Sequence, residues 1–343
     1  MIRSKSVKIL AVALAGGFLL LNSSVSSAAT TKSATNSVTT VQTNTNKVDK
    51  GKKLAKNTYM TVAYKPNRHI HIYLQKGNHF KRNGKLLKNG YTHRIYNLKK
   101  SGKSTYYYIG KNKWVNSANI VTSHLKHTRY HVLKKHTKSR QYYTSQYNPV
   151  FAPWGCASAA LSMLMKYDHS FNKVPGNGEK DELTYMQNHL PRNKANGGQD
   201  GNPYNGAGFT RVIQSYRLKQ YAHQLGDKKI VDISGISLNN IKKVVLAGHP
   251  VLYYGWSSYN GNGKGAQPWP RNHCKVIFGY SKKSNTFLVH DPLYMNSHFY
   301  KGGGGAREGI HNGYDLGPIA WVKASHINRE FAHGGGNHAL TIR

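Results

Sequence analysis

The sequence predicts an α+β protein in which a small antiparallel β module precedes a larger domain of mixed helices and strands. Short strand-like runs alternate with turn residues over residues 51–122. Over residues 139–330, amphipathic helical stretches are instead interspersed with apolar runs of strand length. A segment rich in His and Lys, residues 123–138, is the expected connector, and residues 331–343 are the expected C-terminal tail.

The β module is predicted from its strands and from the turns between them. Runs such as His69–Leu74 and Tyr106–Ile109 have the composition of strands. Turns are predicted at Lys76-Gly77-Asn78, Arg82-Asn83-Gly84, Lys88-Asn89-Gly90 and Lys111-Asn112-Lys113. His69 and His71 would share one face of a strand. A solvated face is favoured over a metal site there, because no further ligand cluster accompanies them, and we expect neither a metal nor a cofactor.

The larger domain is predicted from one compact helix and a helix-to-strand succession. Residues 156–167 are a helical stretch preceded by Pro153-Trp154-Gly155. Ser237 is a candidate N-cap for a second helix, which Gly248 ends before a strand begins near Val251. Two apolar strands follow, at residues 276–280 and 286–290.

The first 29 residues have the three-part layout of a cleavable secretory signal peptide. Basic residues precede the apolar stretch 9–21, and small residues ending at Ala29 follow it. An uncleaved membrane anchor is the alternative, but a spanning helix needs about 20 apolar residues. We therefore expect a secreted protein without a transmembrane segment after signal cleavage. Residues 30–50, rich in Thr, Asn, Ser and Lys, are the expected flexible linker.

The charge of the chain is strongly and unevenly positive. Lys and Arg number 50 against 12 Asp and Glu, for a formal net charge of +38. No acidic residue lies between Gly51 and Tyr167. Such a block cannot be neutralised internally, so it favours a polyanionic partner. For an exported protein these are wall teichoic acids, anionic lipids or extracellular nucleic acid, with general adaptation of surface charge as the alternative.

Three residues form a candidate catalytic set. Cys156 lies where a loop meets a helix, and a helix N-terminus stabilises a thiolate. His273 precedes one predicted strand, and Asp291 follows the next. Two adjacent antiparallel strands can bring such residues side by side. The order Cys, His, carboxylate is that of papain-like thiol hydrolases, although a chain with 19 His can meet this pattern by chance.

The residues around this set are more specific. They resemble secreted, stand-alone relatives of the bacteriocin-leader-processing cysteine peptidases (family 39-like), in the correct order over about residues 140–325. The segments that carry the resemblance are Gln146-Tyr147-Asn148, Trp154-Gly155-Cys156, Leu161-Ser162-Met163, Gly201-Asn202-Pro203-Tyr204-Asn205-Gly206, Asp232-Ile233-Ser234-Gly235, Ala247-Gly248-His249-Pro250-Val251, Asn272-His273, Gly279-Tyr280 and His290-Asp291-Pro292.

The resemblance implies a papain-like fold and a role for each residue. Cys156 would be the nucleophile, His273 the base and Asp291 the group that orients it. Gln146 would supply a side-chain amide donor to the oxyanion, alongside the backbone N–H of the nucleophile. Two features depart from the family: Cys274 directly follows the histidine, and residues 259–271 form a polar insertion rich in Gly and Pro.

The two cysteines pose a choice between a disulfide and a free thiol. Exported proteins with paired cysteines often carry a disulfide. However, neighbouring residues of a strand point to opposite faces, so a bridge from Cys156 to Cys274 would pull His273 away from the nucleophile. We therefore expect a free catalytic Cys156 and a buried, inert Cys274.

The basic module resembles the wall-anchoring domain of lactobacillus surface-layer proteins (SLAP type). The resemblance is carried by Gly84-Lys85, Lys88-Asn89-Gly90, Tyr106-Tyr107-Tyr108-Ile109-Gly110, Trp114-Val115 and Ala118-Asn119-Ile120. It implies binding to anionic cell-wall polymers, the teichoic acids, rather than to a specific nucleic acid. Family copies often come in pairs, whereas one full copy is evident here.

These expectations combine into one function and one alternative. The first is an exported, cell-wall-associated thiol hydrolase that cleaves peptide or related amide bonds through a Cys-His-Asp triad, with peptides or peptidoglycan peptides as substrates. The alternative is a non-catalytic wall-binding surface protein that uses the peptidase fold as a binding scaffold. A thiol-directed probe distinguishes them, because only the first requires a highly reactive cysteine.

Overall fold

The computed structural model describes residues 51–65, 67–125, 130–131, 136–256, 273–305, 316–334 and 336–343. All of these residues belong to one compact unit, Lys47–Arg343. The predicted signal peptide, the predicted linker and the insertion at residues 259–271 lie outside the described residues. In the part of the chain that is described, no helix has the length and apolar character needed to cross a membrane.

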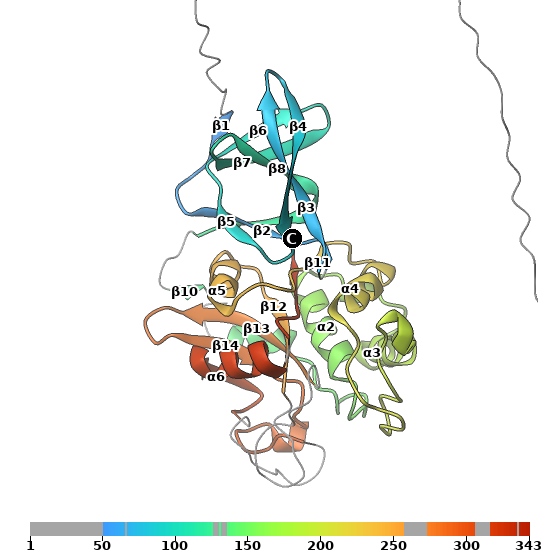
Figure 1. The fold of residues 1–343 in the computed structure, drawn as a ribbon. Helices are drawn as coiled ribbons and strands as arrows, with labels where there is room; N and C mark the ends of the chain where they lie inside the picture. The colour runs from blue at the N-terminus through green and yellow to red at the C-terminus, as the bar shows by residue number, and fades with distance from the viewer. Residues whose placement is uncertain are drawn as a thin grey trace, which may run out of the picture. The chain divides into compact units, whose positions relative to one another are not determined.

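The β module consists of two antiparallel sheets, as the strand and turn pattern predicts (Figure 1). Its strands are β1 Lys52–Lys53, β2 Thr58–Val62, β3 His69–Lys76, β4 His79–Lys88, β5 Thr92–Arg94, β6 Asn97–Ser101, β7 Ser104–Gly110, β8 Lys113–Asn116 and β9 Ile120–His124. The larger sheet has the order β1-β6-β7-β8-β3-β4, and the smaller has the order β5-β2-β9. Alternate apolar residues of these strands, among them Met60, Ile72 and Val115, form the module's own buried core.

One predicted turn in the module is wrong. Asn83 and Gly84 lie inside β4, where the pairing with β3 shifts register between His71 and Tyr73. Gly84 has φ of 79°, which glycine adopts without strain. The turn-like residues therefore make a bulge in a continuing strand, because pairing with β3 on both sides outweighs the local preference.

The larger domain is built on one antiparallel sheet with helices on both faces. Its helices are α1 His136–Ser139, α2 Cys156–Tyr167, α3 Glu179–Asn188, α4 Ser215–Gln224, α5 Leu238–Leu246 and α6 Ala324–Arg329, which runs into the π-helical segment Glu330–Gly334. Its strands are β10 Tyr130–His131, β11 Ile230–Asp232, β12 Val251–Gly255, β13 His273–Ser281, β14 Thr286–His290, β15 Ile319–Lys323 and β16 Ala339–Ile342. The main strand order is β11-β16-β12-β13-β14-β15.

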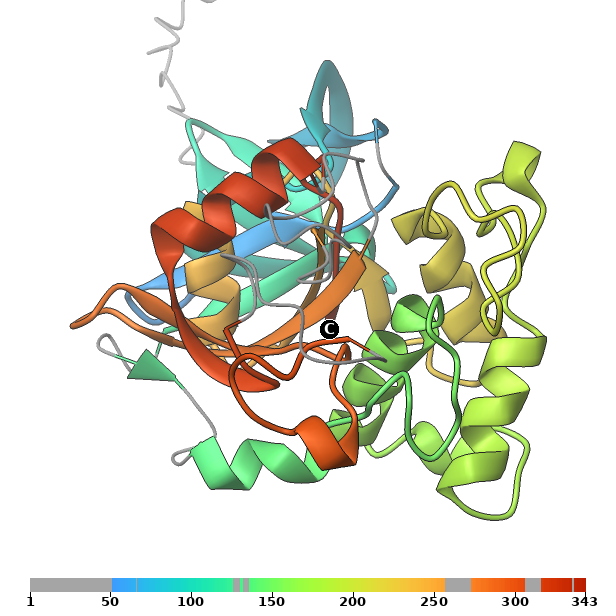
Figure 2. The ribbon, with the colours of Figure 1, turned by 90° about the horizontal axis from the view of Figure 1, so that it is seen from below.

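Each face of this sheet packs against its own set of helices. Alternate strand residues such as Leu252 and Val276 join the core beneath α2, α3 and α4. Their neighbours Val251 and Ile277 join the core beneath α5 and α6. Figure 2 shows the green-to-yellow helices α2, α3 and α4 on one side of the orange strands and the red helix α6 on the other. The predicted α+β class, with the Cys156 helix packed on an antiparallel sheet, is therefore confirmed.

Helix α2 begins and ends where the sequence predicts. It is rich in Ala, Leu and Met, which favour helices, and nearly every side chain in it is buried. Gly155 precedes it because a side chain there would collide with Gln187. A Cβ at that position would lie 2.1 Å from the Gln187 amide nitrogen, which donates to the Gly155 carbonyl over 3.0 Å. This contact fixes the loop from which the helix, and with it Cys156, begins.

The C-terminal residues differ from the predicted tail. Strand β16 pairs with β11 on one side and β12 on the other, so it lies within the sheet. Its four residues alternate toward the two apolar cores and are all buried. The sequence of this strand, three apolar residues and one Thr after a run of glycines, gives little local indication of a strand. Only its long-range pairing defines it as one.

The predicted connector also contains pairing residues. Strand β9 extends to His124, and Tyr130–His131 pairs with the far end of β13. In addition, the turn that ends β4 contacts the larger domain directly. The side-chain amide of Asn89 donates to the Ser234 carbonyl over 2.7 Å, and a Cβ on Gly90 would lie 2.2 Å from the Ile236 nitrogen. The module is therefore attached by more than the connector.

Candidate active site

Cys156 occupies the first turn of α2 and is almost fully buried, with 3% of its surface exposed. The first N–H groups of a helix have no partner within the helix, and the helix dipole places partial positive charge there. Both effects favour a thiolate over a thiol at this position. The sequence-predicted position of this residue at the loop–helix junction is confirmed.

His273 and Asp291 are brought together by adjacent strands, as predicted. His273 opens β13, and Asp291 directly follows β14, which pairs with β13 in antiparallel orientation. The imidazole Nε2 lies 2.7 Å from Oδ1 of Asp291, and both side chains are buried. The Leu293 N–H donates to the same oxygen over 3.0 Å. Because Nε2 is held by the carboxylate, Nδ1 is the ring nitrogen left for the thiol.

The protonation states of Cys156 and His273 depend on each other. Hydrogen bonds from Cys274 and His273, with the charge of the imidazolium, lower the pKa of the Cys156 thiol to about 5, although burial opposes this. Burial lowers the pKa of His273, but the charge and hydrogen bond of Asp291, together with the thiolate, raise it to about 9. Between these two values the pair is a thiolate and an imidazolium.

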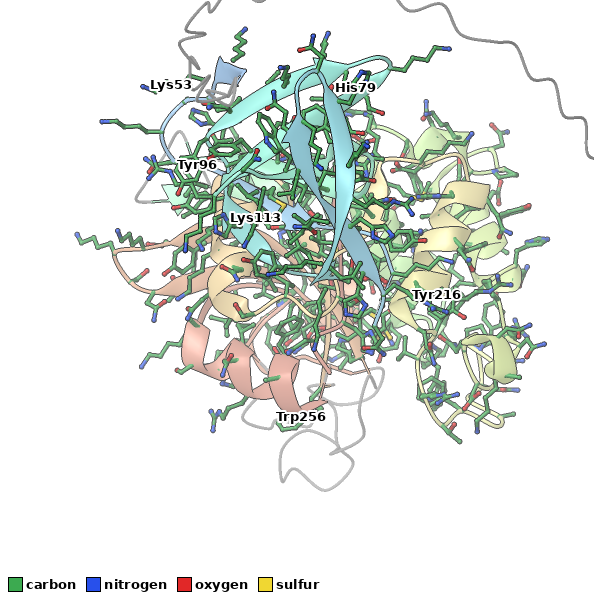
Figure 3. All side chains as sticks on the ribbon, turned by 45° about the horizontal axis from the view of Figure 1, so that its top comes forward. Lys53, His79, Tyr96, Lys113, Tyr216 and Trp256 are labelled. Carbon is green, nitrogen blue, oxygen red and sulfur yellow. The ribbon has the colours of Figure 1, made fainter. Side chains whose placement is uncertain are left out.

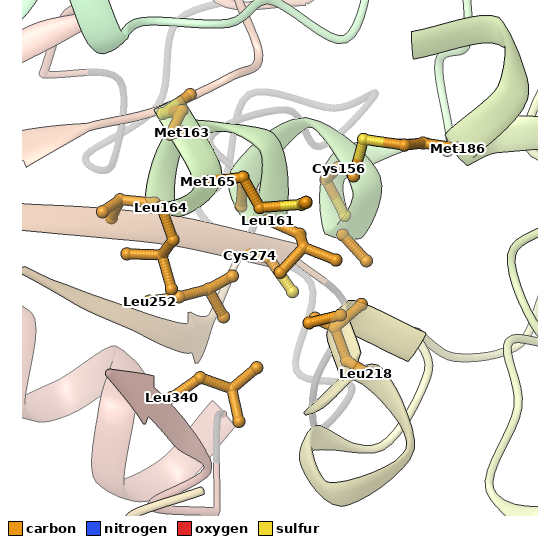
Figure 4. Close-up of a cluster of buried hydrophobic side chains, with 14 of the residues drawn as sticks. Cys156, Leu161, Met163, Leu164, Met165, Met186, Leu218, Leu252, Cys274 and Leu340 are labelled. Carbon is orange, nitrogen blue, oxygen red and sulfur yellow. The ribbon is translucent and has the colours of Figure 1, made fainter. Parts of the chain in front are cut away.

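Cys274 is buried, as predicted, but it lies on the face of the sheet that packs against the Cys156 helix. Both cysteines are free and buried, in agreement with the predicted absence of a bridge. However, a hydrogen bond from Cys274 is the first of the influences that lower the pKa of Cys156, and Figure 4 shows both cysteines within the same buried cluster. Alternation does place Cys274 on the α2 face. His273 also reaches the sulfur because it is the first residue of the strand, at the edge of the helix packing.

Gln146 lies beside the loop that leads to the nucleophile. It is 2% exposed, and its backbone N–H donates to the Pro292 carbonyl over 2.9 Å, next to Asp291. Its side-chain nitrogen donates to the carbonyl of Pro153 over 2.5 Å. One hydrogen of the amide is therefore engaged with the nucleophile loop, and the second remains for another acceptor. Gln146 is therefore a buried residue beside the nucleophile loop.

Two charged residues next to the triad were not predicted. Lys275 lies two residues after His273 on β13, and its ammonium contacts the carboxylate of Asp291. Glu330 forms an ion pair with the same lysine. The sequence did offer a signal for Lys275, which lies between His273-Cys274 and the apolar run 276–278. A charged residue inside a buried strand needs a partner of opposite charge. Glu330 carried no such signal, since its neighbours in sequence are those of an ordinary helix end.

The described residues offer no metal centre: no group of three or more His, Cys, Asp or Glu among them could hold an ion. His69 and His71 alternate with the buried Ile70 and Ile72 on β3, so they lie on the outward face of the module's sheet.

Several solved structures are similar to this chain, all at low identity. A proposed C39-like peptidase from Bacillus anthracis is 18% identical, with a TM-score of 0.41, over 62% of this chain and 97% of that chain. A digestive procathepsin L2 proteinase from the Tenebrio molitor larval midgut is 13% identical, with a TM-score of 0.27, over 63% and 68%. A procathepsin L 3 from the same source is 10% identical, with a TM-score of 0.25, over 58% and 64%.

The comparison of sequences finds one family model that matches part of the larger domain. No curated protein matches the chain. Residues 139–302, which include Gln146, Cys156, His273 and Asp291, match the Peptidase_C39 like family. This segment carries the Cys156 helix and the paired strands that hold the histidine and the aspartate, and the match supports a C39-type cysteine peptidase.

Proposed function

We propose that this protein is an exported, cell-wall-associated thiol hydrolase that cleaves peptide or related amide bonds through Cys156, His273 and Asp291. The observation that carries the proposal is the buried chain of contacts from thiol to imidazole to carboxylate, with the 2.7 Å bond between His273 and Asp291. Peptides and peptidoglycan peptides are the proposed substrates, because their amide carbonyls suit a thiolate nucleophile.

The geometry supports a two-step reaction. The Cys156 thiolate bonds to the carbonyl carbon, and negative charge moves to the carbonyl oxygen, which faces the first N–H groups of α2. Collapse breaks the C–N bond, and His273 gives its Nδ1 proton to the leaving amine. A water molecule, deprotonated by His273, then attacks the thioester. Its hydrolysis releases the acid and restores the thiolate and the imidazolium, while Asp291 keeps the imidazole oriented throughout.

Alkylation of Cys156 by iodoacetamide should have an unusual pH dependence. The thiolate forms as the pH rises through about 5, and the imidazolium is lost as it rises through about 9. We therefore expect fast alkylation already at pH 6, with a first inflection near 5 and a second near 9. An ordinary cysteine titrates near pH 8.5 and reacts slowly at pH 6. Initial rates are measured by mass spectrometry of the proteolytic peptide that carries Cys156, so that labelling of Cys274 is counted separately in the unchanged protein.

The same measurement separates catalysis from the second candidate function. Cys156 is 3% exposed. A sulfur that is inaccessible to reagents in the folded protein would favour the non-catalytic binding scaffold. A single inflection near the ordinary cysteine value, or no labelling of the folded protein, would rule out the proposed hydrolase and leave the binding scaffold.

Wall association is proposed for the β module. The module belongs to the stretch without acidic residues, and its exposed cations include Lys81, Arg82 and Lys85 on β4. Figure 3 shows long side chains extending from its strands, with Lys53 and His79 among those labelled. Lys and Arg suit the phosphates of teichoic acids as charge-assisted donors. Part of the aromatic content packs within the sheet, since Phe80 stacks on Tyr106 at 4.0 Å between ring centroids, while Tyr91 and Tyr96 are exposed.

Binding of the full chain to purified cell wall should fall steeply with added salt. The screening length shortens from about 8 Å at physiological ionic strength to about 3 Å at 1 M. Lys81→Gln with Lys85→Gln should weaken binding further at low salt. The matched control is Lys282→Gln with Lys283→Gln, an exposed lysine pair in the β13–β14 turn of the larger domain. Equal loss in both double variants, or binding that survives both salt and teichoic acid removal, would contradict the assignment to the module.

A further inference from the structure

The charges at the site do not end at Asp291. Its second oxygen, Oδ2, lies 3.5 Å from Nζ of Lys275, and the same nitrogen lies 2.9 Å from Oε2 of Glu330. The side chains of these three residues are only 4%, 5% and 1% exposed. Together with His273 they form a buried row of alternating charges, imidazolium, carboxylate, ammonium and carboxylate.

Three separate elements place this row. His273 and Lys275 are two apart on β13, so they share one face of the strand. Asp291 follows β14, the neighbouring strand. Glu330 opens the π-helical segment after α6, where the Tyr253 hydroxyl donates to Oε1 over 2.6 Å. Glu330 is therefore fixed by a side chain of the sheet as well as by Lys275.

The stability of the fold gives no strong reason for this row. An unpaired buried ammonium is strongly destabilising, and even a buried ion pair often contributes no more to stability than an apolar pair of similar volume. The row has instead a direct effect on the charge of Asp291. Burial raises the pKa of that carboxyl, but His273 and Lys275 lower it below its usual value. Glu330 and Asp291 in turn raise the pKa of Lys275 against its burial.

We propose that Lys275 is a positioning residue of the peptidase site: it holds Oδ2 of Asp291 so that Oδ1 stays on His273, and Glu330 anchors it and balances its charge. This inference rests on the proposed function, since it concerns the same nucleophile pair. Lys275 touches neither substrate nor sulfur in the proposed reaction and acts only through Asp291.

The proposal has a consequence with a definite sign. The other titratable or charged groups near the row are Cys156 on α2, Tyr143 before α2, Tyr253 on β12, and His326 and Arg329 on α6. None of them is substituted in the variants below, but His326 also responds to both charges: burial lowers its pKa, while Glu330 raises it and Lys275 lowers it. Removing the ammonium favours proton uptake by its neighbours, so the apparent pKa values of the thiol–imidazole pair rise. Removing the Glu330 carboxylate disfavours proton uptake by the same groups, so the apparent pKa values of the thiol–imidazole pair fall.

The test is the pH profile of Cys156 alkylation in the full chain. Lys275→Met should move both inflections up by about one pH unit, and Glu330→Gln should move both down by a similar amount, the usual effect of one nearby charge. The double variant should return both toward the wild-type positions. Lys229→Met is the matched control, because this exposed lysine pairs with Asp168 away from the site, and it should leave the profile unchanged.

Each outcome decides the proposal. Unshifted inflections in folded Lys275→Met, or a uniform loss of rate that Glu330→Gln does not repair, would overturn it. If thermal melting shows that Lys275→Met does not fold, Glu330→Gln alone decides, since a neutral amide keeps the bond from Tyr253. Failure of the proposed function is seen separately, in a wild-type profile that is already that of an ordinary thiol.

Discussion

Replacing Cys156 by alanine is expected to abolish amide hydrolysis while leaving the fold and wall binding intact. Without the sulfur no thioester can form, and loss of the nucleophile in such a hydrolase lowers the rate on the order of a millionfold. The helix should tolerate the change, because alanine is a better helix former than cysteine and the cavity is small. The measurement is turnover of a peptide mixture or purified peptidoglycan, with wall binding and thermal melting measured on the same preparation.

Cys274→Ala is the control for this experiment. It also removes a buried sulfur next to α2, but it keeps the nucleophile, so hydrolysis should persist. The hydrogen bond from Cys274 has the largest effect among the influences that lower the pKa of Cys156. In Cys274→Ala, the low-pH limb of the activity profile should therefore move to higher pH. Turnover by Cys156→Ala at the wild-type rate would remove the proposed mechanism, whatever the control shows.

The elements that carry the nucleophile and the aspartate could be predicted closely from sequence. Helix α2 and strand β14 have the predicted ends, because Gly155 precedes the helix and Pro292 closely follows the strand. Strand β13 begins at His273 rather than at Val276, since a polar start to a strand is apparent only from its pairing with β12. The predicted approach of His273 to Asp291 needed no more than two adjacent antiparallel strands.

The parts that sequence could not give depend on contacts between distant residues. Strand β16 is defined by its place between β11 and β12. The bulge at Gly84 is a turn signal that strand pairing overrides. Glu330 reaches Lys275 only because α6 folds over the sheet face on which Lys275 lies. The position of Cys274 beside α2 was missed because the sequence argument assigned that face of the strand to His273, whereas alternation places Cys274 there.

Gln146→Ala is expected to lower the catalytic rate by about 100- to 1000-fold, the usual loss for one oxyanion donor. KM should change little, because the donor matters most as charge develops on the carbonyl oxygen. Gln146→Glu should be at least as harmful, since a carboxylate would repel both that oxygen and the Pro153 carbonyl it would face. Steady-state kinetics on any cleavable peptide give both constants.

The contact with Pro153 offers a second explanation for a loss of activity in Gln146→Ala, and this explanation can be distinguished from an oxyanion role by experiment. If Gln146 only holds the loop before Cys156, its loss would displace the nucleophile and slow every reaction of the thiol. Alkylation by iodoacetamide develops no oxyanion, so it reports the position and ionisation of Cys156 alone. An oxyanion donor therefore predicts slow hydrolysis with unchanged alkylation in Gln146→Ala. A parallel loss of both rates would assign Gln146 to the loop, and unchanged hydrolysis would take it out of the site while leaving Cys156, His273 and Asp291 in place.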